Sequence, residues 1–212
     1  MAEELGLRER KKRDTKWRIY RTALDLFVES GFDKVSVQEI ADASDVSKMT
    51  VFNYFGSKED LVFHPMEEHF GDAARAVRDR GPGESAVDAV RRQFLEMIEV
   101  RDPSVGLHSE PFVLLVRRVV EETPVLRERV VVAAQRGIRA MTDLLAEESG
   151  DPVLATVAAT TLSAARNALI EDHHRRLAAG ESPEAIAAGA VERAHRAFDL
   201  VENGLKGYAV KA

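Results

Sequence analysis

The stretch that decides the fold is Ser36–Asp60, SVQEIADASDVSKMTVFNYFGSKED, which predicts two short helices, a tight turn between them and the start of a third helix. Ser36 followed three residues later by Glu39 is a capping box, which marks a helix start. Ser47 is placed to cap the second helix, because its hydroxyl can accept from a backbone N–H two or three residues on. Ser44–Asp45 lies between the helices as the turn. The pattern predicts a helix-turn-helix, whose second helix fits the major groove of DNA.

Apolar residues at helical spacing give the two short helices a shared seam. The seam consists of Val37, Ile40 and Ala41 on one side and Val46, Val51 and Phe55 on the other. The two helices are therefore expected to pack against each other through these residues.

Five groups of residues in this stretch resemble the most recognisable positions of TetR-type (TetR/AcrR) transcriptional regulators. They are Ile40–Ala41, Val46–Ser47, Thr50, Tyr54–Phe55 and Ser57–Lys58–Glu59. The resemblance is specific over residues 14–63, and beyond them it rests on length and helical pattern. It implies an N-terminal DNA-binding unit followed by a larger helical body that binds a small-molecule effector and dimerises.

Composition bounds the class of protein. The chain has 212 residues, of which 45% are apolar and 31% charged, as expected of a helix-rich globular protein. The absence of cysteine fits a reducing compartment, and we expect a cytoplasmic protein. Met1–Arg13 is charged rather than apolar, so it does not resemble a secretion signal. Val153–Ala165 is a charge-free stretch of 13 residues, short of the ~20 that span a bilayer, so no membrane partner is expected.

Charge is unevenly distributed along the chain. The net charge is −6, yet residues 8–21 hold eight basic and two acidic residues, a local charge of +6. Residues 64–212 hold 19 basic and 24 acidic residues. An acidic body repels DNA, so contact with DNA is expected only near the N-terminal end.

Capping residues, glycines and prolines predict an all-α fold of about nine helices. Prolines after polar residues mark several helix starts, because proline is favoured at the first helical position. Pro65 falls inside the fourth helix and predicts a kink, either as a hinge that responds to ligand or as a bend around the core. The expected helices span residues 13–30, 36–43, 47–53, 57–80, 85–101, 111–121, 124–148, 152–178 and 183–206.

These elements suggest three functional segments. Residues 1–12 are expected to form a flexible basic arm, or a merely solubilising tail. Residues 13–60 are expected to form the helix-turn-helix DNA-binding domain. Residues 61–212 are expected to form the helical effector-binding and dimerisation domain.

The partner expected at the N-terminal end is double-stranded operator DNA. Lysine can donate to guanine, asparagine can pair with adenine, and a threonine methyl can pack on thymine. The resemblance implies that the DNA-contacting positions are Gln38, Lys48, Met49, Thr50, Phe52, Asn53 and Tyr54, with Lys58 at a phosphate. The alternative is that these are solvated polar residues without a partner.

Four residues depart from the family's pattern. Asp45 stands where glycine or asparagine is common, and Met49 replaces a frequent glycine. Val37 and Phe52 lack the hydroxyls of the usual threonine and tyrosine, which should remove contacts to phosphates. The basic run before residue 14 could compensate.

The last two long helices each carry a stripe of small and apolar residues. Such stripes let helix axes approach closely, either in a homodimer or in the core of one chain. A dimer would let the protein bind two half-sites of DNA. The stripes are Ile186, Ala190, Ala194, Phe198, Val201 and Leu205, and Leu154, Ala158, Thr161, Ala165 and Ala168.

A pocket for a largely apolar effector is implied by the resemblance, within the C-terminal body. Abundant Met and Phe favour an adaptable apolar cavity, although any helical core needs such residues. The candidate pocket residues are Phe63, Met66, Phe70, Phe94, Met97, Phe112, Leu115, Val119 and Met141, with His108, Arg139 and Asn167 as weaker polar candidates.

Enzyme chemistry finds no support in the sequence. His173 and His174 are adjacent, so on a helix they point about 100° apart and cannot comfortably share a metal. Common nucleophile, phosphate-loop and zinc motifs are missing from the sequence. We expect no catalytic residue, no cofactor and no metal. The alternatives to a ligand-released repressor are a non-sensing or activating DNA-binding protein of the same fold, and an all-α small-molecule-binding or protein-interaction module.

Overall fold

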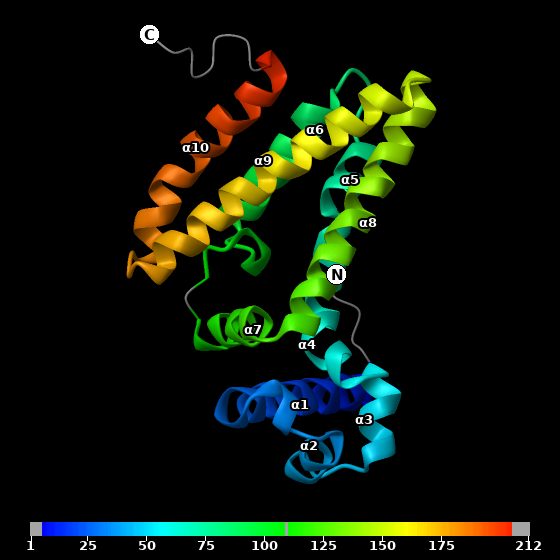
Figure 1. The fold of residues 1–212 in the computed structure, drawn as a ribbon, viewed down its shortest axis with the longest axis vertical. Helices are drawn as coiled ribbons and strands as arrows, with labels where there is room; N and C mark the ends of the chain where they lie inside the picture. The colour runs from blue at the N-terminus through cyan, green and yellow to red at the C-terminus, as the bar shows by residue number, and fades with distance from the viewer. Residues whose placement is uncertain (1–5, 109, 205–212) are drawn as a thin grey trace. The chain divides into compact units, whose positions relative to one another are not determined.

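The computed structural model describes residues 6–108 and 110–204, and within these ranges it contains helices and no strands, which confirms the all-α prediction. Ten α-helices and three short 3-10 helices lie in this part of the chain. Their bounds are α1 Leu7–Ser30, η1 Phe32–Lys34, α2 Val37–Ala43, α3 Lys48–Phe55, α4 Lys58–Glu67, η2 Glu68–Gly71, α5 Asp72–Arg78, α6 Ala86–Glu99, η3 Pro103–Val105, α7 Pro111–Glu122, α8 Pro124–Ser149, α9 Pro152–Ala178 and α10 Pro183–Asn203 (Figure 1).

Most helix bounds match the expected ones to within two or three residues, with two exceptions. α1 begins at Leu7, so residues 7–12, expected to form a flexible arm, are helical. The single helix expected over residues 57–80 is interrupted, because the 3-10 segment η2 separates α4 from α5. The interruption follows α4, the helix that contains Pro65.

The chain divides into two compact units. The first comprises Met1–Glu67 and Pro111–Val130, and the second comprises Glu68–Glu110 and Val131–Ala212. α7 and the start of α8 therefore belong with the N-terminal helices, although they lie some 50 residues beyond α4 in the sequence.

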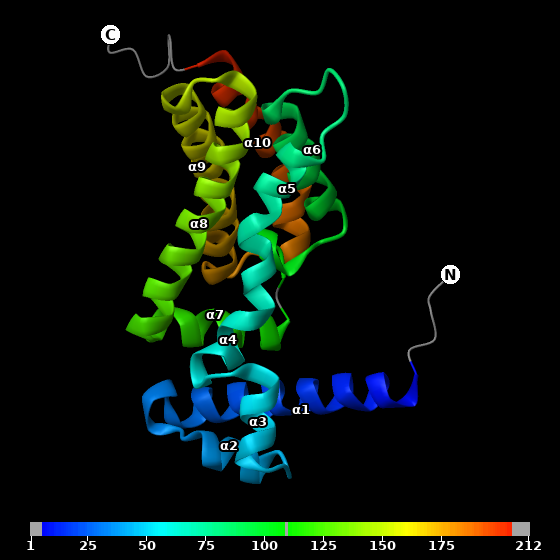
Figure 2. The same cartoon turned by 90° about the vertical axis from the view of Figure 1, so that its right-hand side faces the viewer.

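The core of the first unit forms around α1. Ile19, Ala23 and Leu24 are completely buried there, where α2, α4 and α7 pack against α1. The Phe112 ring from α7 lies 5.0 Å from the Trp17 ring and 5.2 Å from the Tyr20 ring, between ring centroids. Figure 2 shows α2 and α3 beside α1. α7 thus helps to hold the helix on which the helix-turn-helix rests.

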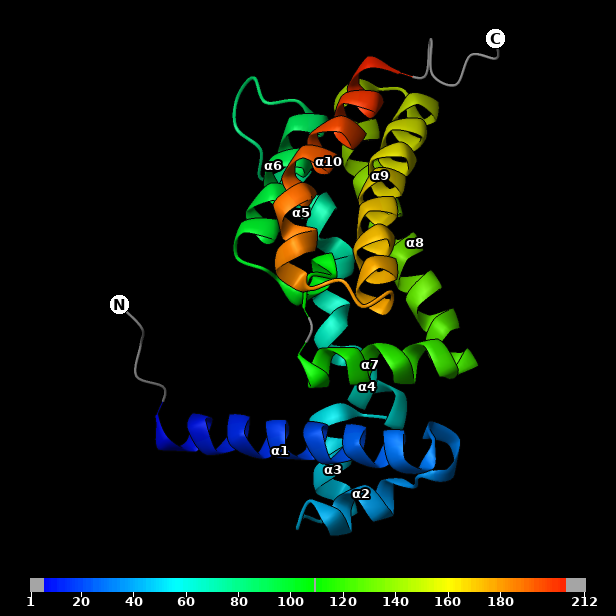
Figure 3. The same cartoon turned by 90° about the vertical axis from the view of Figure 1, so that its left-hand side faces the viewer.

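The core of the second unit forms where α10 packs on α6 and α9 (Figure 3). Phe94 and Phe198 are fully buried there, with ring centroids 6.0 Å apart in an edge-on arrangement. His173 is also fully buried, and its Nδ1 lies 2.7 Å from the Val105 carbonyl oxygen. This histidine is part of the core, and within the described residues no group of three or more acidic or histidine side chains is placed to hold a metal.

The α10 stripe corrects the predicted dimer seam. Ile186, Ala190, Ala194 and Phe198 are each 0% exposed, inside the core of their own unit. The reason is that α6 and α9 of the same chain already cover this face of α10. The structure thus supports the alternative reading for these residues. Val201 packs against the same core, and Leu205 lies outside the described residues.

α9 is long and apolar enough, by length and composition, to cross a membrane, the one such helix in the part of the chain that the structure describes. Only 28% of its most apolar 18-residue window is buried within the chain. A single helix of this kind is weak evidence for a membrane span, since core helices pass the same test. Its uncovered apolar surface nevertheless needs an explanation.

Candidate nucleic-acid interface

The helix-turn-helix is built by the caps that the sequence predicts. The Ser36 backbone N–H donates to Glu39 Oε2 at 2.7 Å, and the Glu39 N–H donates to Ser36 Oγ at 3.2 Å, which completes the capping box of α2. Hydrogen bonds from the Ser36 backbone and side chain to the Glu39 carboxylate lower the pKa of Glu39. The Thr50 N–H donates to Ser47 Oγ at 3.1 Å and so caps α3. Each cap satisfies a backbone donor that the start of a helix leaves free.

The turn between α2 and α3 uses a left-handed residue. Asp45 has a φ of 50°, a conformation that aspartate tolerates better than most residues. The Val46 N–H donates to the Ala41 carbonyl oxygen at 3.0 Å, which closes the turn behind it. Asp45 therefore replaces the common glycine while keeping the backbone conformation of the turn.

α3 has one buried and one exposed face. Val51 and Phe55 are 1% and 5% exposed and pack α3 against the core of the first unit. The opposite face carries Lys48, Asn53 and two large apolar side chains, Met49 at 67% and Phe52 at 39% exposure. Thr50 and Tyr54, also predicted to contact DNA, are half-buried at its edges. Five of the eight predicted residues are thus exposed when Gln38 on α2 is included.

Gln38 is exposed but held by its own helix. Its Nε2 donates to Asp42 Oδ1 at 2.8 Å, one turn further along α2. This bond uses one of the two Nε2 donors, which leaves the other donor and Oε1 for contact with a base.

Lys58 is turned towards its own unit. Its ammonium Nζ donates to the carbonyl oxygens of Phe32 at 2.9 Å and Val35 at 3.2 Å, and lies 4.4 Å from the Phe32 ring centroid. Two of the three donors of the ammonium are engaged in this way. Lys58 therefore fixes the segment that joins α1 to α2, a role that the sequence did not reveal.

Replacing Lys58 with Met is expected to lower the free energy of unfolding by about 1–3 kcal/mol, because two part-buried carbonyl oxygens lose their donor. Urea unfolding followed by circular dichroism measures the change. Lys48→Met, which alters an exposed lysine, is the matched control and should leave stability within about 0.5 kcal/mol. Unchanged stability of Lys58→Met together with a smaller salt dependence of DNA binding would instead assign Lys58 to a phosphate.

A second polar contact joins α4 to α8 within the first unit. Arg129 forms an ion pair with Asp60, and its guanidinium lies 4.5 Å from the centroid of the Phe63 ring. Burial acts to raise the pKa of Asp60, but hydrogen bonds from Ser57 and Arg129 hold it below its ordinary value. Asp60 therefore remains charged at neutral pH and its ion pair joins α4 to α8.

Basic side chains line the solvent side of α1. Arg10, Lys11, Lys12 and Arg13 are exposed near its start, and Arg18 and Arg21 are exposed further along. Because this run is helical, it presents a fixed basic surface rather than an extended arm. Such a surface supplies the sequence-independent attraction to phosphates.

The residues predicted to line an effector pocket do not gather in one unit. Phe63, Phe112 and Leu115 contribute to the first unit, and Val119 is buried in the same core. Phe94, Met97 and Met141 are buried together in the second unit. The remaining candidates divide as follows: Met66 lies in the first unit and Phe70 in the second, both half-buried, while His108 is half-buried and Arg139 and Asn167 are exposed.

The comparisons with known proteins agree with this geometry. Residues 19–64 match the family model described as bacterial regulatory proteins, tetR family. The HTH-type transcriptional regulator TcmR of Streptomyces glaucescens is 33% identical over 120 residues, which are 56% of this chain and 53%, about half, of that protein. The putative mycofactocin biosynthesis transcriptional regulator MftR of Mycobacterium tuberculosis is 26% identical over 92% of this chain and 93% of its own length.

A solved structure extends the likeness beyond the helix-turn-helix. NalD, the secondary repressor of the MexAB-OprM multidrug efflux pump in Pseudomonas aeruginosa, matches with a TM-score of 0.55 and 20% identity, covering 87% of this chain and 96% of its own. At this identity the match shows the fold alone. The family match over residues 19–64, which run from the second half of α1 into α4, and the regulators among its relatives identify the N-terminal part of this chain as a helix-turn-helix domain of the tetR family.

Proposed function

We propose that the protein is a homodimeric transcriptional repressor that binds operator DNA through α3 and is released from it by a small molecule. The observation that carries the proposal is the exposed face of α3, where a lysine and an asparagine flank two large apolar side chains. Exposed apolar residues beside base-reading polar groups suit a major-groove surface, because thymine methyls and base edges lie side by side there. Operator binding would place the protein in the cytoplasm, beside the chromosome.

DNA binding is assigned to residues 13–60, with the basic surface of α1 as a further source of phosphate contacts. Effector binding and dimerisation are assigned to residues 61–212, although α7, within this range, packs on α1 in the first unit. Thr50 and Tyr54 are assigned secondary roles at the DNA surface because both are half-buried, and Gln38 because one of its amide donors is used within its own helix. Phe52 belongs to the exposed face of α3.

Lys48→Ala and Asn53→Ala are each expected to weaken specific operator binding by about 1–3 kcal/mol, because each removes hydrogen bonds to a base edge. Fluorescence anisotropy with operator DNA and with random DNA of equal length measures both affinities at a fixed salt concentration. The loss should be confined to the operator.

The matched control for Lys48→Ala is Arg118→Ala, which removes a positive charge from an exposed side chain of α7 in the same unit. It should leave the ratio of operator to random affinity unchanged. A Lys48→Ala protein that binds both DNAs as the parent does would contradict the assignment of α3.

The homodimer is supported by the exposed side of α9. Val153, Leu154 and Val157 are 70%, 64% and 58% exposed, and the helix continues this face with Thr161, Ala164 and Ala168. From Leu154 onwards these residues recur every three or four positions and form one stripe, and Val153 extends it at the start of the helix. A second copy of the chain would cover it, since small and apolar side chains let two identical helices approach closely.

Release by a small molecule is supported by the interior of the second unit, where Phe94, Met97 and Met141 form an adaptable apolar core. A ligand that binds one conformation of this unit more tightly would change DNA affinity by that difference.

A further inference from the structure

Arg166 is a buried charge in the middle of α9. Its side chain is 9% exposed, and its Nε has no hydrogen-bond partner among the described residues. Among the described residues, the guanidinium has one hydrogen-bond contact, from Nη2 to the Met97 thioether sulfur at 3.9 Å. A thioether is a weak acceptor, so Nε has no partner there and Nη2 has only a weak one.

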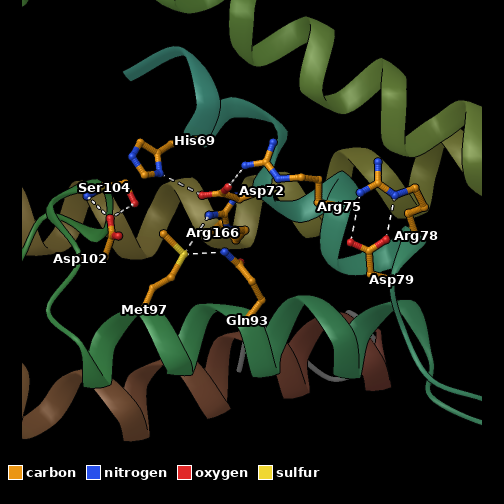
Figure 4. Close-up of polar contacts among 10 residues, drawn as sticks. All are labelled: His69, Asp72, Arg75, Arg78, Asp79, Gln93, Met97, Asp102, Ser104 and Arg166. Atoms are coloured by element: carbon orange, nitrogen blue, oxygen red, sulfur yellow. Dashed lines mark hydrogen bonds and ion pairs between the residues drawn. The ribbon is translucent and has the colours of Figure 1, made fainter. Parts of the chain in front are cut away.

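The neighbours of Arg166 on α6 are polarisable or themselves unsatisfied (Figure 4). The Phe94 ring centroid lies 5.9 Å from the centre of the guanidinium. Gln93 Nε2 donates to the Met97 sulfur at 2.6 Å, while Gln93 Oε1 is buried with no partner in the described part of the chain. Whichever way the amide is turned, one of its ends has no strong partner.

The carboxylate that acts on Arg166 through space, that of Asp72, is already engaged elsewhere. Asp72 accepts from Arg75 through Oδ1, and its Oδ2 lies 3.2 Å from His69 Nδ1. This hydrogen bond raises the pKa of His69, which is the response expected of a histidine held by a carboxylate. Figure 4 shows the Asp72 carboxylate between His69 and Arg75. Asp72 therefore supplies Arg166 with attraction at a distance rather than with a hydrogen bond.

Burial without a direct partner is unfavourable for a guanidinium. Desolvation lowers the pKa of Arg166, and attraction from Asp72 offsets it in part. Arginine nevertheless stays protonated in proteins, so a charge remains inside the unit. A buried charge without a strong hydrogen-bonded partner is unfavourable for the fold. An acceptor that arrives with a ligand would remove this penalty.

We propose that Arg166, together with Gln93, binds the carboxylate of an acidic small-molecule effector whose apolar body contacts Phe94 and Met97. The inference rests on the proposed function, since it names the class of molecule that would release the protein from DNA. The planar guanidinium matches the two oxygens of a carboxylate. The Gln93 amide hydrogen-bonds a polar substituent next to the carboxylate of the effector. The Phe94 ring and the Met97 thioether pack against its aromatic or aliphatic body.

The test uses the full-length protein and pairs of acids and their neutral amides: benzoate and benzamide, 1-naphthoate and 1-naphthamide, octanoate and octanamide. Isothermal titration calorimetry gives the dissociation constants. At least one acid is expected to bind the parent tenfold or more tightly than its amide. In Arg166→Met the ratio of the dissociation constants of amide and acid should fall to about one, while the amide still binds. No preference for any of the three acids, or a preference that survives in Arg166→Met, would overturn the proposal.

Two further variants separate ligand recognition from structural effects. Arg136→Met removes an exposed arginine of α8 in the same unit and should keep the full preference for the acid. Arg166→Lys keeps the charge but not the planar fork, so it should retain part of the preference. Without ligand, Arg166→Met should melt at the same temperature as the parent or about 2–4 °C higher, because a buried charge is removed. A lower melting temperature together with unchanged acid preference would show a purely structural arginine.

The same titrations in the presence of operator DNA separate this inference from the proposed function. An acid that binds through Arg166 without changing operator affinity would leave the site intact and contradict ligand release. Release of DNA by neutral amides as readily as by acids, in parent and Arg166→Met alike, would contradict the acid site and leave the repressor function standing.

Discussion

Replacing Val157 with Glu is expected to convert the protein to a monomer and to weaken binding to an operator with two half-sites by about 100-fold or more. Once a dimer has bound one half-site, its second subunit is held at a high effective concentration near the other half-site. A monomer loses this gain in affinity, although its α3 still makes every contact with its own half-site. Val157 is 58% exposed on α9, so the charge meets solvent in a monomer and an apolar surface in a dimer. Sedimentation velocity at micromolar concentration and fluorescence anisotropy with one-site and two-site DNA measure the two effects.

Val100→Glu is the control for Val157→Glu. Val100 is 73% exposed at the end of α6 in the same unit, away from the α9 stripe, and its replacement should leave a dimer with full affinity. Binding of the Val157→Glu protein to a single half-site should equal that of the parent. A parent protein that sediments as a monomer at this concentration would end the dimer proposal.

The helix-turn-helix could be predicted closely from the sequence because its determinants are local. The capping box of Ser36 and Glu39 and the cap at Ser47 act across three residues, and all of them form as expected. The left-handed turn at Asp45 depends on one residue. Periodicity likewise separated the buried Val51 and Phe55 from the exposed side of α3.

Periodicity could not say what covers an apolar stripe. Ala190 and Ala194 on α10 have the small side chains of a helix-helix interface, and they are in one, but the partner helices belong to the same chain. The spacing of residues determines which face of a helix is apolar. Which helix packs on that face depends on the tertiary arrangement of helices that are far apart in the sequence. On α9 the sequence predicted a stripe that included Ala158 and Ala165, but both are half-buried, and the exposed side of the helix carries Val157 and Ala164 instead.

Contacts between residues far apart in the sequence could not be predicted either. Phe112 was a plausible pocket residue until the structure placed it against Trp17 and Tyr20, more than 90 positions earlier. Lys58 resembled a phosphate contact, yet two carbonyl oxygens in the segment after α1 receive its hydrogen bonds. One signal was available for Arg166, since it directly follows the charge-free stretch of 13 residues and is the first charged residue of α9.

Replacing Gly137 with Ala is expected to destabilise the protein by about 1–3 kcal/mol, although alanine is the better helix former. Gly137 lies within α8, where a Cβ atom would fall far inside van der Waals contact with the carbonyl oxygen of Phe70 in η2. That oxygen belongs to the backbone and cannot rotate away as a side chain does. Either α8 or the segment at Phe70 must move, and both belong to the second unit. Urea unfolding followed by circular dichroism measures the loss.

Gly189→Ala supplies the opposite expectation on α10. Its Cβ would approach only the Arg193 guanidinium, at 3.3 Å from Nη2, and that flexible side chain can give way. The substitution should therefore stabilise the protein by about 0.5–1 kcal/mol, the usual gain from alanine in a helix. A Gly137→Ala protein as stable as Gly189→Ala would show that α8 does not approach η2 this closely. A loss at residue 137 with a gain at residue 189 would show that the glycine of α8 is required for close packing against the 3-10 segment that follows α4.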